Sequence, residues 1–145
     1  MTTIKIEMDG LNDLLGKLNQ VGLAAEDVIE EVLFDIATET QAEAIKGING
    51  PPKSGRVYEK TNPNRTHTAS APGQYPASDT GRLASSVRMV PVGPTAYEVG
   101  TNVEYGPMLE FGTVKMAARP WLLPSFEKAK IGIEREILAK LEAKL

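Results

Sequence analysis

The chain has 145 residues, a formal net charge of −3 and no cysteine, with 41% hydrophobic and 24% charged residues. This is the composition of one globular domain that can bury a core, and it excludes a strongly basic protein that wraps nucleic acid over its whole surface, a disulfide scaffold and a thiolate zinc site. No apolar run reaches the roughly 18–20 residues that span a bilayer, and the charged N-terminal segment does not fit a secretory signal.

Charge is unevenly distributed along the chain. Residues 1–46 carry a net charge of −7, and residues 47–82 carry +3. The remaining segments are close to neutral, with 0 over 83–125 and +1 over 126–145. An acidic front and a basic middle give the protein two kinds of surface, which suits asymmetric contacts.

The N-terminal segment alternates apolar and polar residues over 3–9, which predicts a half-buried strand with Ile4, Ile6 and Met8 on one face. Gly10 interrupts this pattern. A short helix is predicted next, because leucines recur at helical spacing at Leu11, Leu14, Leu15 and Leu18.

A long helix is predicted from near Ala24. Its apolar stripe consists of Val28, Ile29, Val32, Leu33, Ile36, Ala37, Thr40, Ala44 and Ile48. Carboxylates crowd the first turns, where they favour the positive end of the helix dipole, and Lys46 lies near the far end. The helix is expected to stop at Gly47, Gly50, Pro51 and Pro52.

Residues 49–80 are rich in proline, glycine and small polar residues and show no lasting helical or strand period. A loop of about 30 residues is unusual in a compact domain and is usually functional or disordered. We interpret it as a mobile arm that orders against a partner, with an insertion without function as the alternative. Its candidate contact residues are Lys53, Arg56, Tyr58, Lys60, Arg65 and Tyr75.

Regular structure is predicted again after residue 79. Residues 86–92 and 96–103 alternate and flank a Gly93-Pro94 turn, which predicts a hairpin. Residues 105–113 are predicted to form one short helical turn. A last helix is predicted from about Pro124, with an apolar face that must pack on the sheet or on a neighbouring subunit, formed by Phe126, Ala129, Ile133, Ile137, Leu141 and Leu145.

Catalytic signatures are weak. His67 lies in the proline-rich segment with no acid near it in sequence, which indicates an exposed loop histidine. No G-x-S-x-G, G-x-x-x-x-G-K-[ST] or G-x-G-x-x-G pattern occurs. The weak catalytic signatures favour a structural protein, and two other functions stay open. One is nucleic-acid binding through the basic residues of 53–65. The other is a metal-dependent hydrolase that uses Glu26, Asp27, Glu30 and Glu31.

Three motifs then occur in order: Thr80-Gly81-Arg82-Leu83 with Ser85-Ser86-Val87, Tyr105-Gly106 leading to Glu110-Phe111-Gly112-Thr113, and Ala118-Arg119-Pro120-Trp121-Leu122 with Pro124. This combination resembles the tail-completion (tail-to-head joining) family of long-tailed bacteriophages. The resemblance covers most of the chain and is best over 79–130.

The resemblance implies one α+β domain over 1–145: a small antiparallel sheet packed by a long helix in the N-terminal half and a C-terminal helix, with a long flexible loop. It implies a structural virion protein without enzymatic activity, and the residues themselves predict neither a cofactor nor a metal. The expected assembly is a homo-oligomeric, sixfold ring at the head-proximal end of the tail. Its expected neighbours are the head-closure or connector protein and the tail terminator or tail tube, and DNA passes through it without specific binding.

The resemblance also implies a place in the virion neck, after assembly in the host cytoplasm and without a membrane. Its motif residues are read as scaffolding, with Gly81 and Gly112 in backbone conformations that other residues resist. Glu110 is expected to form an ion pair with Arg119 that fixes the 105–121 corner. Trp121 is expected in the core, with a subunit contact as the alternative. The remaining motif residues are Arg82, Leu83, Tyr105, Phe111 and Pro120.

Overall fold

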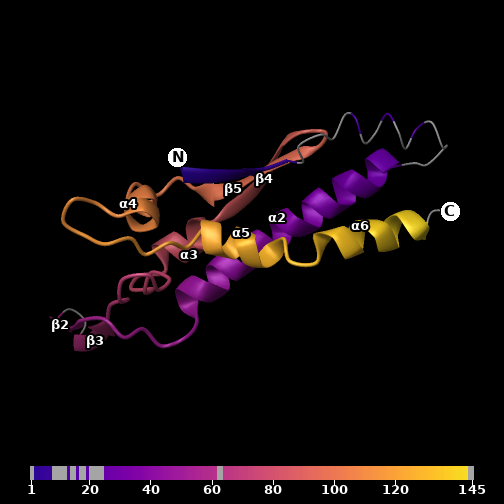
Figure 1. Ribbon diagram of the computed structural model, residues 1–145. Helices are drawn as coiled ribbons and strands as arrows, with labels where there is room; N and C mark the ends of the chain where they lie inside the picture. Colours follow the sequence, from indigo (N-terminus) through magenta and orange to yellow (C-terminus); the bar gives the residue numbers. More distant parts are fainter. Residues whose placement is uncertain are drawn as a thin grey trace.

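The computed structural model describes residues 2–7, 13, 16, 19, 25–61 and 64–143. It is an α+β fold in which a long helix packs on an antiparallel sheet and further helices follow toward the C-terminus (Figure 1). The predicted fold class is therefore confirmed. The leucines on which the short helix was predicted, Leu11, Leu14, Leu15 and Leu18, lie outside the described residues, as do Met8 and Leu145.

The sheet has three strands in the order β1 (Thr2–Ile6), β5 (Ala96–Thr101) and β4 (Arg88–Gly93), all antiparallel. The alternation in the sequence places Ile6, Tyr97 and Val99 in the core. Val99 pairs with Ile4 on one side and with Met89 on the other. The N-terminal strand and the hairpin are thus confirmed, with β5 as the central strand.

The first strand of the predicted hairpin begins later than expected and the second ends earlier, and local hydrogen bonds give the reason. Ser86 belongs to helix α3 (Arg82–Ser86), because its hydroxyl donates to the carbonyl of Leu83 at 2.6 Å. The returning strand ends at Thr101, because the Thr101 hydroxyl accepts from the N–H of Val103 at 3.0 Å and turns the chain away from the sheet.

Helix α2 (Ala25–Asn49) buries every residue of the predicted apolar stripe. It continues past Gly47, so the expectation that Gly47 stops the helix is wrong. The ring of Tyr75 packs on this glycine so closely that a Cβ there would lie 2.3 Å from two of its ring carbons. Gly47 therefore serves side-chain packing, and the helix ends at Asn49.

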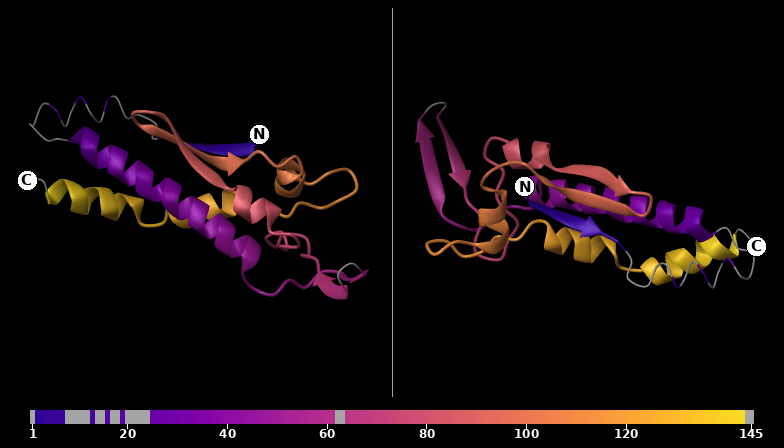
Figure 2. Two further views of the ribbon diagram at one scale, coloured as in Figure 1. Left: turned by 180° about the vertical axis from the view of Figure 1, so that it is seen from behind. Right: turned by 90° about the horizontal axis from the view of Figure 1, so that it is seen from above.

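The predicted C-terminal helix is two helices, α5 (Leu123–Ala129) and α6 (Ile133–Glu142). Gly132 separates them with a φ of +81°, a left-handed conformation that ends one helix and starts the next. Both helices run alongside α2, so the apolar face packs on α2 (Figure 2). Lys140 of α6 reaches Glu31 at 2.9 Å and Asp35 at 3.3 Å on α2.

The 49–80 segment contains a β-hairpin, which corrects the expectation that no strand pattern persists there. Strands β2 (Val57–Thr61) and β3 (Asn64–Thr68) pair in an antiparallel, two-stranded sheet that projects from the body (Figures 1 and 2). Below it, the N–H of Gly55 donates to Ala69 at 2.8 Å, which extends the ladder. The mobility of the segment stays a prediction.

Candidate assembly interface

The corner after the sheet is fixed by Glu110, which lies on the short predicted helix α4 (Gly106–Phe111). Its carboxylate accepts three backbone N–H groups, from Trp121 at 2.7 Å, Leu122 at 2.9 Å and Leu123 at 3.0 Å. These groups open helix α5 and have no partner within it. Glu110 thus caps a helix that begins thirteen residues later along the chain, at Leu123.

The expected ion pair between Glu110 and Arg119 is wrong. The Arg119 guanidinium instead donates to two backbone carbonyls, those of Ser70 at 3.2 Å and Ala117 at 2.8 Å. The three N–H groups already occupy both oxygens of the Glu110 carboxylate, which removes the need for a cation. Arg119 therefore joins the corner to the 70–79 segment through neutral carbonyls.

Trp121 is completely buried, which confirms the prediction that it belongs to the core. Its indole N–H donates to the carbonyl of Gly106 at 3.2 Å, so the polar end of the ring is satisfied inside the protein. Pro120 lies in the connection directly before it. The ring ties the start of α4 to the start of α5.

A surface that we name the apolar knob projects beside this corner and consists of Met108, Phe111 and Val114. Phe111 is 76% exposed, Val114 is fully exposed and Met108 is half exposed. A tight turn holds the loop: Gly112 has a φ of +76°, as its expected conformational role requires, and the N–H of Thr113 donates to Met116 at 2.8 Å.

A groove of about 740 Å³ lies between the body and this corner. Leu83 and Tyr105 line it, so the first and second motifs of the sequence meet there. The Arg82 guanidinium lies 5.8 Å from the centre of the Tyr105 ring, and Gly81 turns the chain with a φ of +78°. The apolar lining includes Ile48, Pro76, Ala84, Leu109 and Met116.

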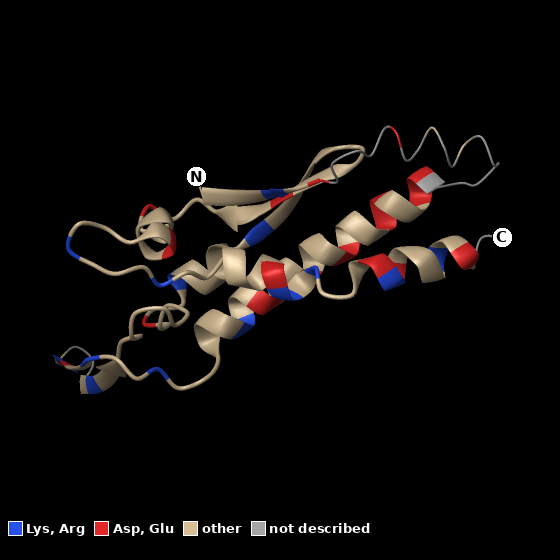
Figure 3. Cartoon of the chain, viewed as in Figure 1, with Lys and Arg blue, Asp and Glu red and all other residues tan. Residues whose placement is uncertain are grey.

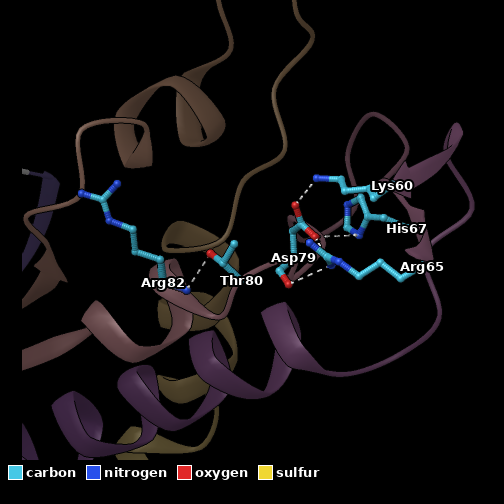
Figure 4. Close-up of polar contacts among 6 residues, drawn as sticks. All are labelled: Lys60, Arg65, His67, Asp79, Thr80 and Arg82. Atoms are coloured by element: carbon cyan, nitrogen blue, oxygen red, sulfur yellow. Dashed lines mark hydrogen bonds and ion pairs between the residues drawn. The ribbon is translucent and has the colours of Figure 1, made fainter. Parts of the chain in front are cut away.

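The hairpin is tethered to the rest of the protein by Asp79 (Figure 4). The carboxylate forms ion pairs with Lys60 on β2 and Arg65 on β3. The hydrogen bond from Lys60 and then the hydrogen bond and charge of Arg65 hold the pKa of Asp79 below its ordinary value. His67 lies 3.8 Å away with 16% of its side chain exposed, so the expectation of an exposed loop histidine without a nearby acid is wrong.

The other basic-arm candidates make contacts within the chain too. The ammonium of Lys53 donates to the carbonyl of Gly47 at 2.6 Å, and partial burial lowers its pKa. The Tyr75 hydroxyl lies 3.0 Å from that of Ser125, and Lys128 lies 4.8 Å from the ring centre. Arg56 lies 5.3 Å from the ring centre of Tyr58, and this pair stays largely exposed. The predicted contact residues therefore form two groups. Lys53, Lys60, Arg65 and Tyr75 contact the body of the protein through their side chains, whereas Arg56 and Tyr58 contact each other.

Sequence reasoning missed Asp79, Ser125 and the hairpin. The hairpin had a signal, because the Asn62-Pro63 dipeptide is typical of turns and separates two stretches that contain Val, Tyr and Thr. Asp79 and Ser125 had none, since each acts on residues far away in the sequence.

The described residues hold no group of three or more His, Cys, Asp or Glu side chains that is arranged to bind a metal ion. Glu26, Asp27, Glu30 and Glu31 lie exposed along the first turns of α2. Among the helices that the structure describes, none is long and apolar enough to cross a membrane.

Comparison with known families identifies the family of this chain. The model of a family described as "Bacteriophage HK97-gp10, putative tail-component" matches residues 11–112, which is more than half of the chain. The chain belongs to this HK97 gp10-like family. Searches of curated proteins and of solved structures returned no significant match.

Membership makes the protein a component of the phage virion tail, with a structural role that implies no enzymatic activity. The matched region contains α2, the β2–β3 hairpin, α3, strands β4 and β5 of the sheet, and α4. It ends at Gly112, so the third motif and helices α5 and α6 lie beyond it. In this family member, Glu110 connects the matched region to the helices that follow.

Proposed function

We propose that this tail component completes the tail and joins it to the head connector as a homo-oligomeric ring, sixfold in number, through which DNA passes. The observation that supports this proposal best is that exposed apolar surfaces lie beside a corner whose backbone is held by buried contacts. The Glu110 cap and buried Trp121 fix the corner, while the apolar knob and the outer face of the hairpin are left to solvent. Exposed apolar surface of this kind marks contact sites.

The hairpin supports a role in assembly for a separate reason. A two-stranded hairpin is marginally stable by itself, and this one is held by Asp79, which pairs with Lys60 and Arg65 near the turn end of the two strands. Val57 remains 58% exposed and Tyr58 44% exposed. A neighbouring copy, the connector or the tail tube would cover these side chains.

The charge distribution supports a conduit for DNA. Figure 3 marks the acidic residues along α2, where seven carboxylates and no basic residue occur between positions 25 and 43. A surface of the same sign as the duplex lets DNA slide past without adhering. The reading as a nucleic-acid-binding accessory protein is less favoured, because both Lys60 and Arg65 are already paired with Asp79, which offsets part of their positive charge.

Deletion of the gene in the phage that encodes this protein tests the proposal. We expect filled heads and separate tails by electron microscopy, and normal virions when the protein is supplied from a plasmid. Virions that assemble and infect normally without the protein would contradict it. Tails that are missing altogether would assign the protein an earlier step in tail formation and also overturn the joining role.

A further inference from the structure

We propose that neighbouring copies join through two different surfaces, with the apolar knob of one copy packed against Phe34 on helix α2 of the next. This inference rests on the proposed homo-oligomer and names the surfaces that meet. The partner is a second copy of this chain, and the contact pairs two different surfaces.

The knob is ready for a contact because its backbone is already ordered. The Gly112 turn, the bond from Thr113 to Met116 and the Glu110 cap fix the loop on both sides. A fixed loop loses little conformational freedom when it binds, which favours association. Phe111 and Val114 therefore contribute apolar area at a small entropic cost.

The opposite charges of the two ends select the orientation. Lys115 follows Val114 of the knob, and Arg82 lines the neighbouring groove, whereas the charged residues in the first half of α2 are all acidic (Figure 3). Two knobs, or two acidic helices, would bring like charges together. Complementary charge favours the knob of one copy on the acidic helix of another.

Phe34 provides an apolar centre within that acidic surface. It is 45% exposed, and its ring meets Tyr97 edge to face at 6.0 Å between centroids, which fixes its orientation. Glu30 lies one helical turn earlier, on the same side of α2. It is exposed and forms no ion pair with another described residue, so it is placed to receive Lys115 beside an apolar contact.

The geometry makes the contact heterologous. Helix α4 with the loop that follows it, which carries the knob, and the start of α2 lie at opposite ends of the molecule (Figure 1). The knob of one chain therefore cannot contact the first half of α2 in the same chain, and each copy offers both surfaces to its neighbours. Heterologous contacts that repeat produce a closed ring or an open filament.

Disulfide cross-linking in assembled virions tests this contact, because the natural chain has no cysteine. Val114→Cys and Glu30→Cys are placed in the same chain, and purified virions are oxidised. We expect a ladder of covalent oligomers, which neither single variant gives. The matched control combines Val114→Cys with Lys5→Cys, an exposed position on the sheet. An absent ladder, or one of equal yield in the control, overturns the contact.

Charge reversal is a second, independent test. Lys115→Glu and Glu30→Lys are each expected to reduce virion yield at least about tenfold, and the double variant is expected to restore most of it. Circular dichroism verifies that each variant folds. No loss in either single variant, or no recovery in the double variant, overturns the ion pair that defines the orientation.

An amine cross-linker on wild-type virions separates this inference from the proposed function. Oligomers linked through lysines, without the 30–114 disulfide ladder, would retain the ring and reject this contact. Virions that contain only isolated copies of the protein would reject both.

Discussion

The carboxylate of Glu110 accepts the backbone N–H of Trp121 at 2.7 Å, across a separation of eleven residues. Only 8% of Glu110 is exposed, so its two oxygens are turned inward to three N–H groups. The residue lies where the family match ends and determines how the last two helices leave the body. Its loss has consequences for both stability and assembly.

We expect Glu110→Gln to lower the free energy of unfolding by about 1–3 kcal/mol, because the amide replaces one acceptor oxygen with an NH₂ that faces N–H donors. Urea unfolding measures this difference. Glu104→Gln, at an exposed position nearby, is the control and should change stability by less than about 0.5 kcal/mol. Equal stability of the two variants would show that the cap is unimportant.

Gly47→Ala is expected to destabilise the protein by about 1–3 kcal/mol, although alanine favours helix, because its Cβ would collide with the Tyr75 ring. Thermal and urea unfolding measure the loss. The double variant Gly47→Ala with Tyr75→Ala should lose less than the sum of the two single changes. Strict additivity would contradict a direct collision between these two residues.

The Asp79 tether makes hairpin stability depend on pH. Because the pKa of Asp79 is lowered in the folded protein, its contribution is present above the ordinary pKa of 3.8 and is lost as the pH falls through the folded value. We expect Asp79→Asn to increase hydrogen exchange over residues 57–68 at pH 7. The difference from wild type should disappear at pH values below the folded pKa.

Exchange in helix α2 provides the internal control for that experiment, and it should remain unchanged. Equal exchange of the hairpin in both proteins at pH 7 would show that the ladder alone holds it. A difference that persists in strong acid would assign the effect to a group other than Asp79.

DNA affinity distinguishes the two readings of the basic segment. We expect the wild-type protein to bind duplex DNA weakly, with little change when Lys53, Arg56, Lys60 and Arg65 are all replaced by Gln. Binding titrations at several salt concentrations measure this. Tight binding whose salt dependence falls after the replacement would favour the accessory-protein reading, since that dependence counts the neutralised phosphates.

The elements with strong periodicity could be predicted from the sequence. The apolar stripe of α2 and the alternation of β1, β4 and β5 are determined by local pattern, and the buried residues match it. The position of Trp121 followed from its size and apolar character. These features need no knowledge of which distant segment they meet.

The remaining features depend on contacts between distant residues. Gly47 is predicted from the sequence to stop the helix, because Tyr75, against which it packs, lies 28 positions further along the chain. The charges of Glu110 and Arg119 predict an ion pair, whereas the backbone N–H groups that Glu110 binds have no signal in the sequence. Gly132 divides the last helix through its conformation, although the apolar spacing continues across it.

The antiparallel pairing of β1 with β5 determines how early the sheet can form during synthesis. Thr2 pairs with Thr101, so the first strand has no partner in the sheet until nearly 100 further residues have been made. At about 5–20 residues per second, this delay lasts on the order of 5–20 s on the ribosome. During that interval the apolar stripe of α2 also lacks its cover, since α5 is translated later still. The nascent chain therefore exposes this apolar stripe to aggregation until α5 has been made.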